Sequence, residues 1–577
     1  MNDDQSRQLI LTDLDSNMMV EAAAGTGKTT SIVGRMVNLI ATGKCEITTI
    51  AATTFTRKAA AELRDRFQSA LRIEADSDVR SAQEKTLLRD ASDRIEHAFV
   101  GTFHSFCSTI LRERPIECQV DPDFREIDES EDFQLREQAW QTFLKGLYSK
   151  EDNRLDRIYE LGLKTNDLKE CFDRFVEFPD VDQWPHQAPP RIDIDDLKNQ
   201  TRDYVAHIRT MIPTFPTERG KDKLMSRYEN IVRASDNADW RIDCQFFDLI
   251  ELFDTSHGAT QYCWSDGTED EIKAAKKIAK RECVRFDEFK TNVVQPALNW
   301  WYQHRYEFVI DLLEQAQLIY INVRRASGGL DFQDLLIRTA ESLKSQPELR
   351  SYFQRRFSHV LVDEFQDTDP IQAEIVFYVT SVDNDELDWK KCVPLPGSLF
   401  LVGDPKQSIY RFRRADIVTY QQVKAIFQQS GGKIVGLSKN FRSDEEILNW
   451  VNPVFGELLG YQETVHSPSA VDMEQGRVCQ SEGEITGVET LVLPTGMEQE
   501  DLVVHESEQI AKHIAELIAR KAKVPRTEKE LTQGIPEHVQ PGDFLIITKN
   551  KKHLGAYAEA LDRYLSLIHI SEPTRPY

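Results

Sequence analysis

The chain has 577 residues and a net charge of −25, with 40% hydrophobic and 29% charged residues. This composition is typical of globular domains and excludes wholesale disorder and collagen-like repeats, and the length fits about four domains. The sequence holds no apolar run of roughly 18 residues, so we expect no transmembrane helix. The acidic N-terminus, MNDDQSRQLI, does not resemble a secretion signal, so we expect a cytoplasmic protein.

Charge and cysteine usage narrow the choice of partners only a little. The negative net charge argues weakly against nucleic acid, because a local basic groove can coexist with acidic outer faces. Nine cysteines are scattered and none forms a CxxC pair. This pattern predicts buried free thiols and favours neither a zinc ribbon nor a disulfide framework.

The first motif in the chain is a glycine loop. Residues 18–22 predict a short buried strand, and a helix is predicted to reach about Ile40. Between them stands the sequence AAGTGKTT, which gives the order of strand, glycine loop and helix that a P-loop requires. One departure is that Ala22 stands where the motif usually begins with glycine. The predicted nucleotide-binding residues of this segment are Ala24, Gly25, Thr26, Gly27, Lys28, Thr29 and Thr30.

The chemistry expected of this loop is phosphate binding. Gly25 and Gly27 let backbone N–H groups approach phosphate oxygens, and the helix N-terminus adds partial positive charge. Lys28 would reach the β- and γ-phosphates, and the Thr29 hydroxyl would ligate Mg²⁺. The sequence therefore predicts ATP and Mg²⁺ as cofactors.

A second apolar strand supplies the acidic partner of the P-loop. Residues 357–362 read FSHVLV and are followed by Asp363 and Glu364. Such a continuous apolar run fits a strand buried on both faces of a parallel sheet. Asp363 at its end would hold Mg²⁺, and Glu364 would orient and deprotonate the attacking water.

Further motifs carry a resemblance to a known family. They read TFTRKAAAEL, GTFHSFC, DEFQDTDPIQ, LVGDPKQSIYRFR and LSKNFRS, at residues 54–63, 101–107, 363–372, 401–413 and 437–443. With the P-loop, they resemble superfamily 1 DNA helicases of the UvrD/Rep kind, in the order of that family. The residues of these motifs are most similar to those of the RecB/AddA branch, the motor subunits of helicase–nuclease complexes that process double-strand breaks.

The resemblance implies roles around the nucleotide. Gln5 matches an adenine-reading glutamine, with Gln8 as a competing candidate and an ordinary surface glutamine as the alternative. Phe441 matches an aromatic that stacks on adenine, with core packing as the alternative. The implied catalytic residues are Glu364, Lys28, Gln407, which senses the γ-phosphate, and Arg442, which reaches it from the second motor domain.

The resemblance also implies contacts with single-stranded DNA. Phe55, Tyr410 and Phe412 match aromatics on which bases stack, and core burial is the alternative for each. The other implied DNA-binding residues are Arg57, Thr102, His104 and Arg413, and Arg57 and its neighbour Lys58 could instead be solvated helix charges. Arg414 stands where relatives usually carry glycine. This cation could add a phosphate contact or narrow the DNA path.

The pattern of elements predicts an α/β fold with P-loop RecA-like motor domains, in which parallel sheets are flanked by helices. Strands are expected at 46–54, 95–101, 358–364, 397–403, 433–437, 487–493 and 543–549, with helices near 502–521 and 551–564. Helical spacing at 133–147, 270–285 and 298–326 predicts a large, mostly helical insertion, and a proline-rich patch at 179–191 predicts a boundary inside it.

These patterns give an expected domain order. Residues 1–111 and 336–432 form the two parts of the first motor domain, residues 112–335 form the insertion, and residues 433–564 form an incomplete second motor domain. Residues 565–577 resemble a translated sequencing adapter, so we expect a non-native tail.

The function expected from the resemblance is an ATP-dependent DNA helicase or translocase with 3′→5′ polarity, acting in double-strand break repair and recombination. Its expected partners are single-stranded DNA, duplex with a single-stranded end, and a helicase–nuclease subunit, with no membrane. The alternative is a truncated fragment that binds ATP and single-stranded DNA but does not unwind.

Overall fold

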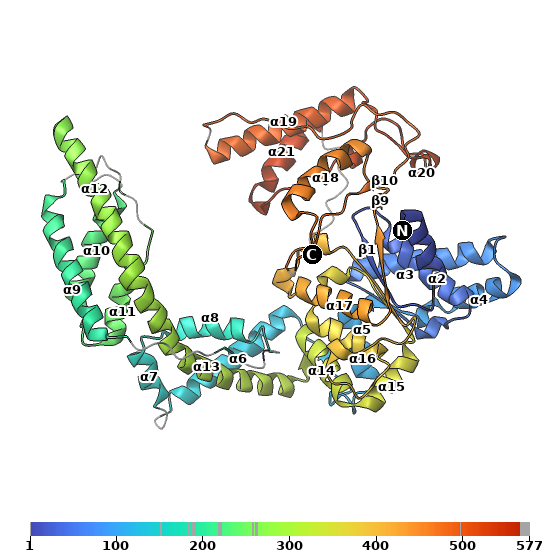
Figure 1. The fold of residues 1–577 in the computed structure, drawn as a ribbon, viewed down its shortest axis with the longest axis horizontal. Helices are drawn as coiled ribbons and strands as arrows, with labels where there is room; N and C mark the ends of the chain where they lie inside the picture. Colours follow the sequence, from blue (N-terminus) through green and yellow to red (C-terminus); the bar gives the residue numbers. More distant parts are fainter. Residues whose placement is uncertain are drawn as a thin grey trace. The chain divides into compact units, whose positions relative to one another are not determined.

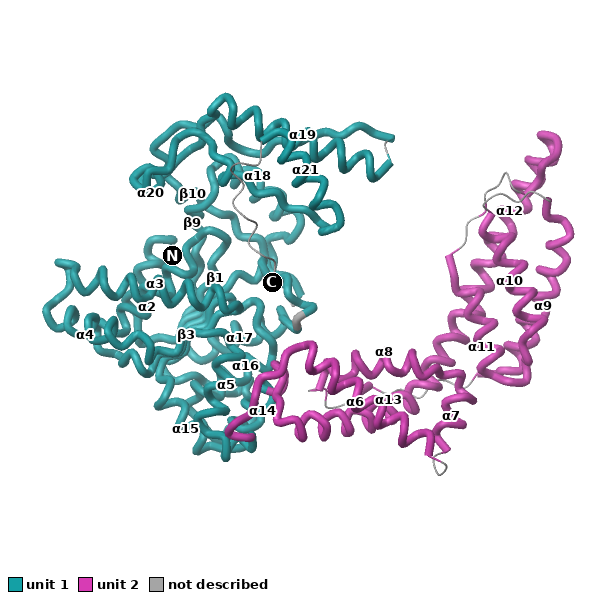
Figure 2. The backbone as a smooth tube through the Cα atoms, turned by 180° about the vertical axis from the view of Figure 1, so that it is seen from behind, with its two compact units in different colours: residues 1–120, 335–577 teal, residues 121–334 magenta. Residues whose placement is uncertain are grey.

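The computed structural model describes residues 2–149, 153–179, 181, 184–185, 192–216, 222–256, 259, 264–464, 466–496 and 498–565. These residues divide into two compact units (Figure 2). Unit 1 comprises Met1–Val120 and Leu335–Tyr577, and unit 2 comprises Asp121–Asp334. Unit 2 is therefore an insertion in the sequence of unit 1, slightly narrower than the expected range 112–335.

Unit 1 is built on a six-stranded parallel sheet in the order β3-β2-β6-β7-β1-β8 (Figure 1). The strands are β1 Met18–Ala22, β2 Ile50–Thr54, β3 Phe99–Thr102, β6 His359–Val362, β7 Leu399–Gly403 and β8 Lys433–Leu437. β1, β2 and β7 are mostly apolar and almost fully buried, as strands covered by helices on both faces must be. The α/β class is confirmed.

Helices cover both faces of this sheet. The helices of this part are α1 Asp3–Thr12, α2 Lys28–Ala41, α3 Arg57–Asp76, α4 Ala82–Asp93, α5 Phe103–Glu113, α14 Phe332–Ser345, α15 Pro347–Arg356, α16 Pro370–Thr380 and α17 Ile417–Gln429. One hydrophobic core joins α1 through α4 to alternate residues of the strands, such as Met18, Val20, Phe400 and Val402. Figures 1 and 2 both show α5, α16 and α17 on the opposite side of the sheet.

Unit 2 is helical, as the spacing predicted. Its helices are α6 Glu129–Leu147, α7 Arg154–Glu160, α8 Thr165–Phe175, α9 Ile194–Met211, α10 Lys223–Asn237, α11 Asp243–Glu251, α12 Glu269–Phe289 and α13 Gln295–Ser327. A short parallel pair, β4 Arg125–Glu126 with β5 Gly329–Leu330, joins the start of this unit to its end. Most of the proline-rich patch at 179–191 lies outside the described residues.

The boundary expected at residue 433 is wrong, because β8 belongs to the first sheet. All five residues of β8 pair in parallel with β1, from Met18 opposite Lys433 to Ala22 opposite Leu437. The apolar pattern predicted a strand here but could not say which sheet it joins. The predicted second motor domain would therefore begin after Leu437.

The chain after β8 holds the helices α18 Glu445–Leu459, α19 Gln499–Ala519, α20 Glu528–Thr532 and α21 Leu554–Leu565. The helices predicted near 502–521 and 551–564 are thus present. The strands predicted at 487–493 and 543–549 are wrong, because both described segments run without a ladder partner. Several of their apolar side chains stay in solvent, with Val492, Leu545 and Ile547 each more than 80% exposed.

Two expectations concern the ends and the membrane. In the described part of the chain, no helix is long and apolar enough to cross a membrane. The expected tail at 565–577 lies outside the described residues, apart from Leu565 at the end of α21.

Candidate nucleotide and DNA site

The predicted site residues gather at the carboxyl edge of the six-stranded sheet. The P-loop follows β1, Asp363 and Glu364 follow β6, and Gln407 follows β7. In open parallel sheets, ligands bind outside the carboxyl ends of the strands. The strand order also separates two groups, since the DNA candidates after β3 and β2 lie at one end of the edge and the loops after β1 and β8 lie at the other.

The P-loop has the backbone of a phosphate cradle. Gly25 and Gly27 adopt left-handed φ values of 72° and 87°, which suit glycine. The N-cap of α2 is Gly27, which offers no side-chain oxygen to the first-turn amides. These amides and the helix dipole fit a phosphate group. Thr29 lies in this first turn, beside Lys28.

The segment after β8 packs directly onto the P-loop. Asn440 Nδ2 donates to the Ala24 carbonyl at 2.8 Å, and the Phe441 amide donates to the Gly25 carbonyl at 2.9 Å. A β-carbon on Gly25 would lie 2.8 Å from Arg442 Cβ. The fold therefore places the backbone of Arg442 beside the P-loop, and its contact with a γ-phosphate remains a prediction.

Lys28 and Glu364 form the centre of the site. Lys28 Nζ lies 2.8 Å from Glu364 Oε2, and Gln366 Nε2 donates to the same oxygen at 2.9 Å. Glu364 has a left-handed φ of 53°, a conformation that is uncommon for a residue with a β-carbon and is concentrated at functional sites. The carboxylate is thus held by a cation and an amide.

Burial raises the pKa of two neighbouring carboxyl groups. The pKa of Asp363 rises to about 6 because the group is desolvated and lies near Glu364. The pKa of Asp367 also rises to about 6, for the same two reasons. One Asp367 oxygen, Oδ1, is buried without a hydrogen-bond partner in the described structure. Among the described residues no group of three or more histidine, cysteine or carboxylate side chains is arranged to hold a metal ion, so Thr29 and Asp363 as ligands of Mg²⁺ remain a prediction.

Gln366 connects the Glu364 carboxylate to the loop after β7. Its Oε1 accepts a hydrogen bond from the Asp404 amide at 2.9 Å, while its Nε2 contacts Glu364. Asp404 in turn accepts from Gln407 Nε2 at 2.8 Å and pairs with Lys406 at 2.9 Å. Gln407 is therefore linked to Glu364 through two intermediate residues. Neither Gln366 nor Asp404 was predicted from the sequence, although both stand inside the quoted motifs.

The glutamines of α1 do not reach the P-loop, whereas an arginine between them does. Gln5 is exposed and its side chain closes a capping box with Asn2, and Gln8 is also exposed. Arg7 Nη1 donates to the Thr26 carbonyl at 2.9 Å, and its guanidinium lies 4.9 Å from the Phe441 ring centroid. An adenine contact by Gln5 remains a prediction.

Aromatic side chains from the loops after β2 and β7 lie close together. The Phe55 ring stacks on Tyr410 at 4.8 Å, and Phe412 lies 5.7 Å from Tyr410. Phe412 is 78% exposed, and Phe441 at the nucleotide end is 47% exposed. Core burial, the alternative considered for both, is therefore wrong. Phe55 and Tyr410 are half-buried, and the exposed Phe412 ring beside them offers a surface on which nucleic acid bases can stack.

The remaining residues predicted to bind DNA differ in how far their side chains are exposed to solvent. Arg57 and Lys58 are exposed in the first turn of α3, so the alternative of solvated helix charges stays open for both. Thr102 is 8% exposed and caps α5 by accepting from the Ser105 amide at 3.2 Å. His104 lies in the first turn of α5, and the side chain of Arg413 lies outside the described part.

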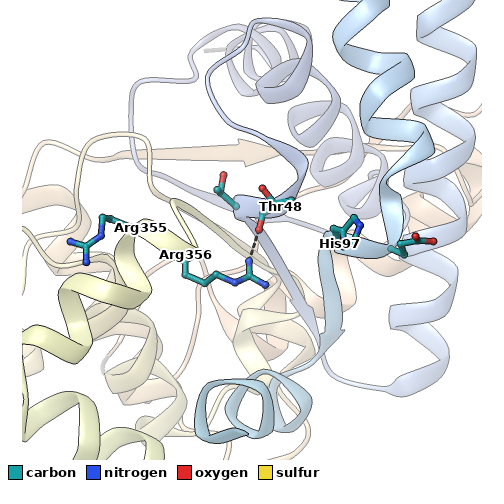
Figure 3. Close-up of a pocket in the computed structure, with 6 residues that line it drawn as sticks. Thr48, His97, Arg355 and Arg356 are labelled. Carbon is teal, nitrogen blue, oxygen red and sulfur yellow. Dashed lines mark hydrogen bonds between the residues drawn. The ribbon is translucent and has the colours of Figure 1, made fainter. Parts of the chain in front are cut away.

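A cavity of about 390 Å³ lies at the opposite, amino edge of the sheet (Figure 3). Its lining residues all precede strands: Thr48, Thr49, Glu96, His97, Arg355 and Arg356. Arg356 donates from the end of α15 to the Thr48 carbonyl. The cavity is separate from the nucleotide edge.

Comparison with known proteins agrees with this geometry. Residues 1–428 match the UvrD/REP helicase N-terminal domain. This match covers more than half of the chain, which therefore belongs to the UvrD/REP helicase family.

Particular relatives are each named as the A subunit of an ATP-dependent helicase/nuclease. The relative from Listeria monocytogenes serotype 4b is 25% identical over 92% of this chain and 46% of its own length. Those from Geobacillus thermodenitrificans and Geobacillus kaustophilus are 27% and 26% identical, over 77% and 94% of this chain and 38% and 47% of their own lengths. The chain thus spans less than half the length of these curated relatives.

Proposed function

We propose that this chain is the motor part of an ATP-dependent DNA helicase of the helicase–nuclease kind, acting on single-stranded DNA in double-strand break repair and recombination. The observation that carries the proposal is the continuous connection from the P-loop residue Lys28, through Glu364, Gln366 and Asp404, to Gln407 and the aromatic residues that follow β7. The proposed nucleotide site and the proposed base-stacking surface would thus be joined through the loops after β6 and β7.

The nucleotide chemistry follows from the donor set. The P-loop amides and Lys28 would bind the phosphates of ATP, and Arg442 would stabilise charge on the transferred phosphoryl group. Thr29 and Asp363 would hold Mg²⁺, which neutralises phosphate charge. In the described arrangement Lys28 neutralises Glu364. Moving Lys28 to a phosphate would free this carboxylate to accept a proton from water.

The DNA step uses the loop after β7. A shift of Gln407 toward the γ-phosphate would displace the segment that carries Tyr410 and Phe412. Bases stacked on these rings would then move with each cycle of hydrolysis. We propose 3′→5′ movement on single-stranded DNA or on duplex with a single-stranded end. The proposed partner is a helicase–nuclease subunit.

The test is steady-state ATP hydrolysis with and without single-stranded DNA. We expect DNA to stimulate hydrolysis, and we expect Lys28→Ala and Glu364→Gln to abolish the stimulated rate. Arg355→Ala is a matched control, because this exposed arginine lies at the opposite edge of the sheet. Hydrolysis that is indifferent to DNA would contradict the proposal. Displacement of streptavidin from one end of an oligonucleotide measures the polarity.

One observation favours a second candidate function. In the described residues after β8, the only strand pairing beyond isolated bridges joins β9 Lys439–Asn440 to β10 Glu474–Gln475. A RecA-like domain is built on a larger parallel sheet. This chain could therefore bind ATP and single-stranded DNA without unwinding. Binding of both ligands with no DNA-stimulated hydrolysis would favour this candidate, and rapid unwinding would exclude it.

A further inference from the structure

The loop at residues 408–415, here named the aromatic loop, is attached at both ends to the segment after β6. At its start, Ser408 Oγ donates to the Gln366 carbonyl at 3.0 Å. At its end, Arg414 Nε lies 3.1 Å from Asp369 Oδ2. Tyr410 and Phe412 lie between these two attachments. The orientation of the stacking rings therefore depends on contacts with residues near the nucleotide.

The backbone of Arg414 does not favour an arginine. Its φ of 70° is left-handed, and its amide closes the turn by donating to the Arg411 carbonyl at 3.0 Å. A β-carbon is unfavourable in this conformation, and glycine fits it without strain. Arginine at this position therefore carries a backbone strain that glycine would avoid.

The contact partner explains what the side chain contributes. Asp369 is 3% exposed, and its Oδ1 caps α16 by accepting from the Ile371 amide at 2.9 Å. A buried carboxylate requires hydrogen bonds or a nearby positive charge. The Arg414 side chain, itself only 20% exposed, supplies that charge. Since both groups are largely removed from solvent, loss of either partner would leave the other charge buried without this contact, which is costly.

We propose that Arg414 is a positioning residue, which orients the aromatic loop for stacking on single-stranded DNA by pairing with Asp369. The proposal rests on the DNA-binding part of the function above and deepens it. It replaces the two roles that the sequence left open for this cation, a phosphate contact and a narrowing of the DNA path. The guanidinium is directed to a protein carboxylate on the segment after β6.

The experiment measures the affinity for a fluorescent oligothymidylate by anisotropy, over a range of salt concentrations. Arg414→Gly keeps the left-handed turn and removes the ion pair, while Asp369→Asn keeps a helix-capping side chain and removes the charge. We expect each variant to bind about fivefold more weakly, with the salt dependence unchanged. The double variant should bind no more weakly than either single variant, because both changes break one contact. Arg414→Lys should restore most of the affinity, and Arg355→Ala controls for the loss of one positive charge.

Three results would overturn the inference alone. They are wild-type affinity in Asp369→Asn, a salt slope reduced by about one in Arg414→Gly, as loss of a direct phosphate contact requires, and additive losses in the double variant. Wild-type protein that binds no oligonucleotide would instead overturn the DNA-binding function, and the inference with it. Loss of folding in Arg414→Gly is checked by circular dichroism, and Asp369→Asn then supplies an independent test.

Discussion

Gly25 and Gly27 of the P-loop should respond differently to substitution by alanine. Both have left-handed φ values, but the room for a β-carbon differs between them. Such φ values cost a residue with a β-carbon about 1–2 kcal/mol. A β-carbon on Gly25 would also lie 2.8 Å from Arg442 Cβ and 2.9 Å from Asn440 Nδ2, whereas the nearest atom at Gly27 is 3.7 Å away. Overpacking adds about 1–3 kcal/mol.

We therefore expect Gly25→Ala to lower the free energy of unfolding of unit 1 by about 2–5 kcal/mol and Gly27→Ala by about 1–2 kcal/mol. The loss of chain entropy in the unfolded state applies to both variants and cancels in the difference. Urea unfolding, followed by circular dichroism, measures both values. Arg442→Gly removes one of the contacting atoms and should reduce the cost of Gly25→Ala. Equal costs for the two alanine variants would refute the reasoning that the 440–442 segment rests on the P-loop.

Three further predictions concern the sheet edge and its helices. Gln366→Leu removes the amide that positions Glu364, so kcat for ATP hydrolysis should fall about tenfold to a hundredfold with little change in KM; an unchanged kcat would contradict this role. Burial, with Arg35 and Lys44 nearby, lowers the pKa of His359 to about 4 from 6.5. The folded chain therefore binds this proton more weakly than the unfolded chain, and stability should be lost as pH falls from about 6.5 toward 4, by up to roughly 3 kcal/mol. Urea unfolding of His359→Gln should show a flatter pH profile. Tyr410→Ala should weaken binding of single-stranded DNA by about 1–3 kcal/mol while KM for ATP is kept, as anisotropy and kinetics would show.

The nucleotide edge could be predicted because its residues are local to strand ends. The P-loop and the acidic strand each carry their chemistry within a few residues of a buried apolar run, at residues 18–22 and 357–362. Parallel strands then place these residues at one edge without further information. The observed contact between Lys28 and Glu364 follows from that topology.

What the sequence could not show is which strands are neighbours. Gln366 contacts Asp404 because β6 pairs with β7, and that pairing is not visible in either motif alone. For the same reason, the apolar pattern at 433–437 does not reveal that β8 pairs with β1. The segments at 487–493 and 543–549 carry strand-like residues, yet propensity alone does not supply a hydrogen-bonding neighbour.

The contact of Arg7 with the P-loop is a second feature that the sequence does not predict. The family pattern directed attention to Gln5, and the helical spacing of α1 gave no reason to select the next arginine. Its contact with the P-loop depends on the packing of α1 against the segment after β8, where Asp3 accepts hydrogen bonds from the Ser438 and Lys439 amides. Such long-range contacts are tertiary information.

The pairing of β8 with β1 has a consequence for the local concentration of Arg442, the proposed catalytic arginine. Arg442 lies five residues beyond Leu437, and a segment of that length spans at most about 18 Å. Its guanidinium is therefore confined to the neighbourhood of the P-loop at an effective concentration in the millimolar range or above. An arginine finger delivered by a separate protein must be captured from solution for each encounter, whereas in this chain the encounter is intramolecular.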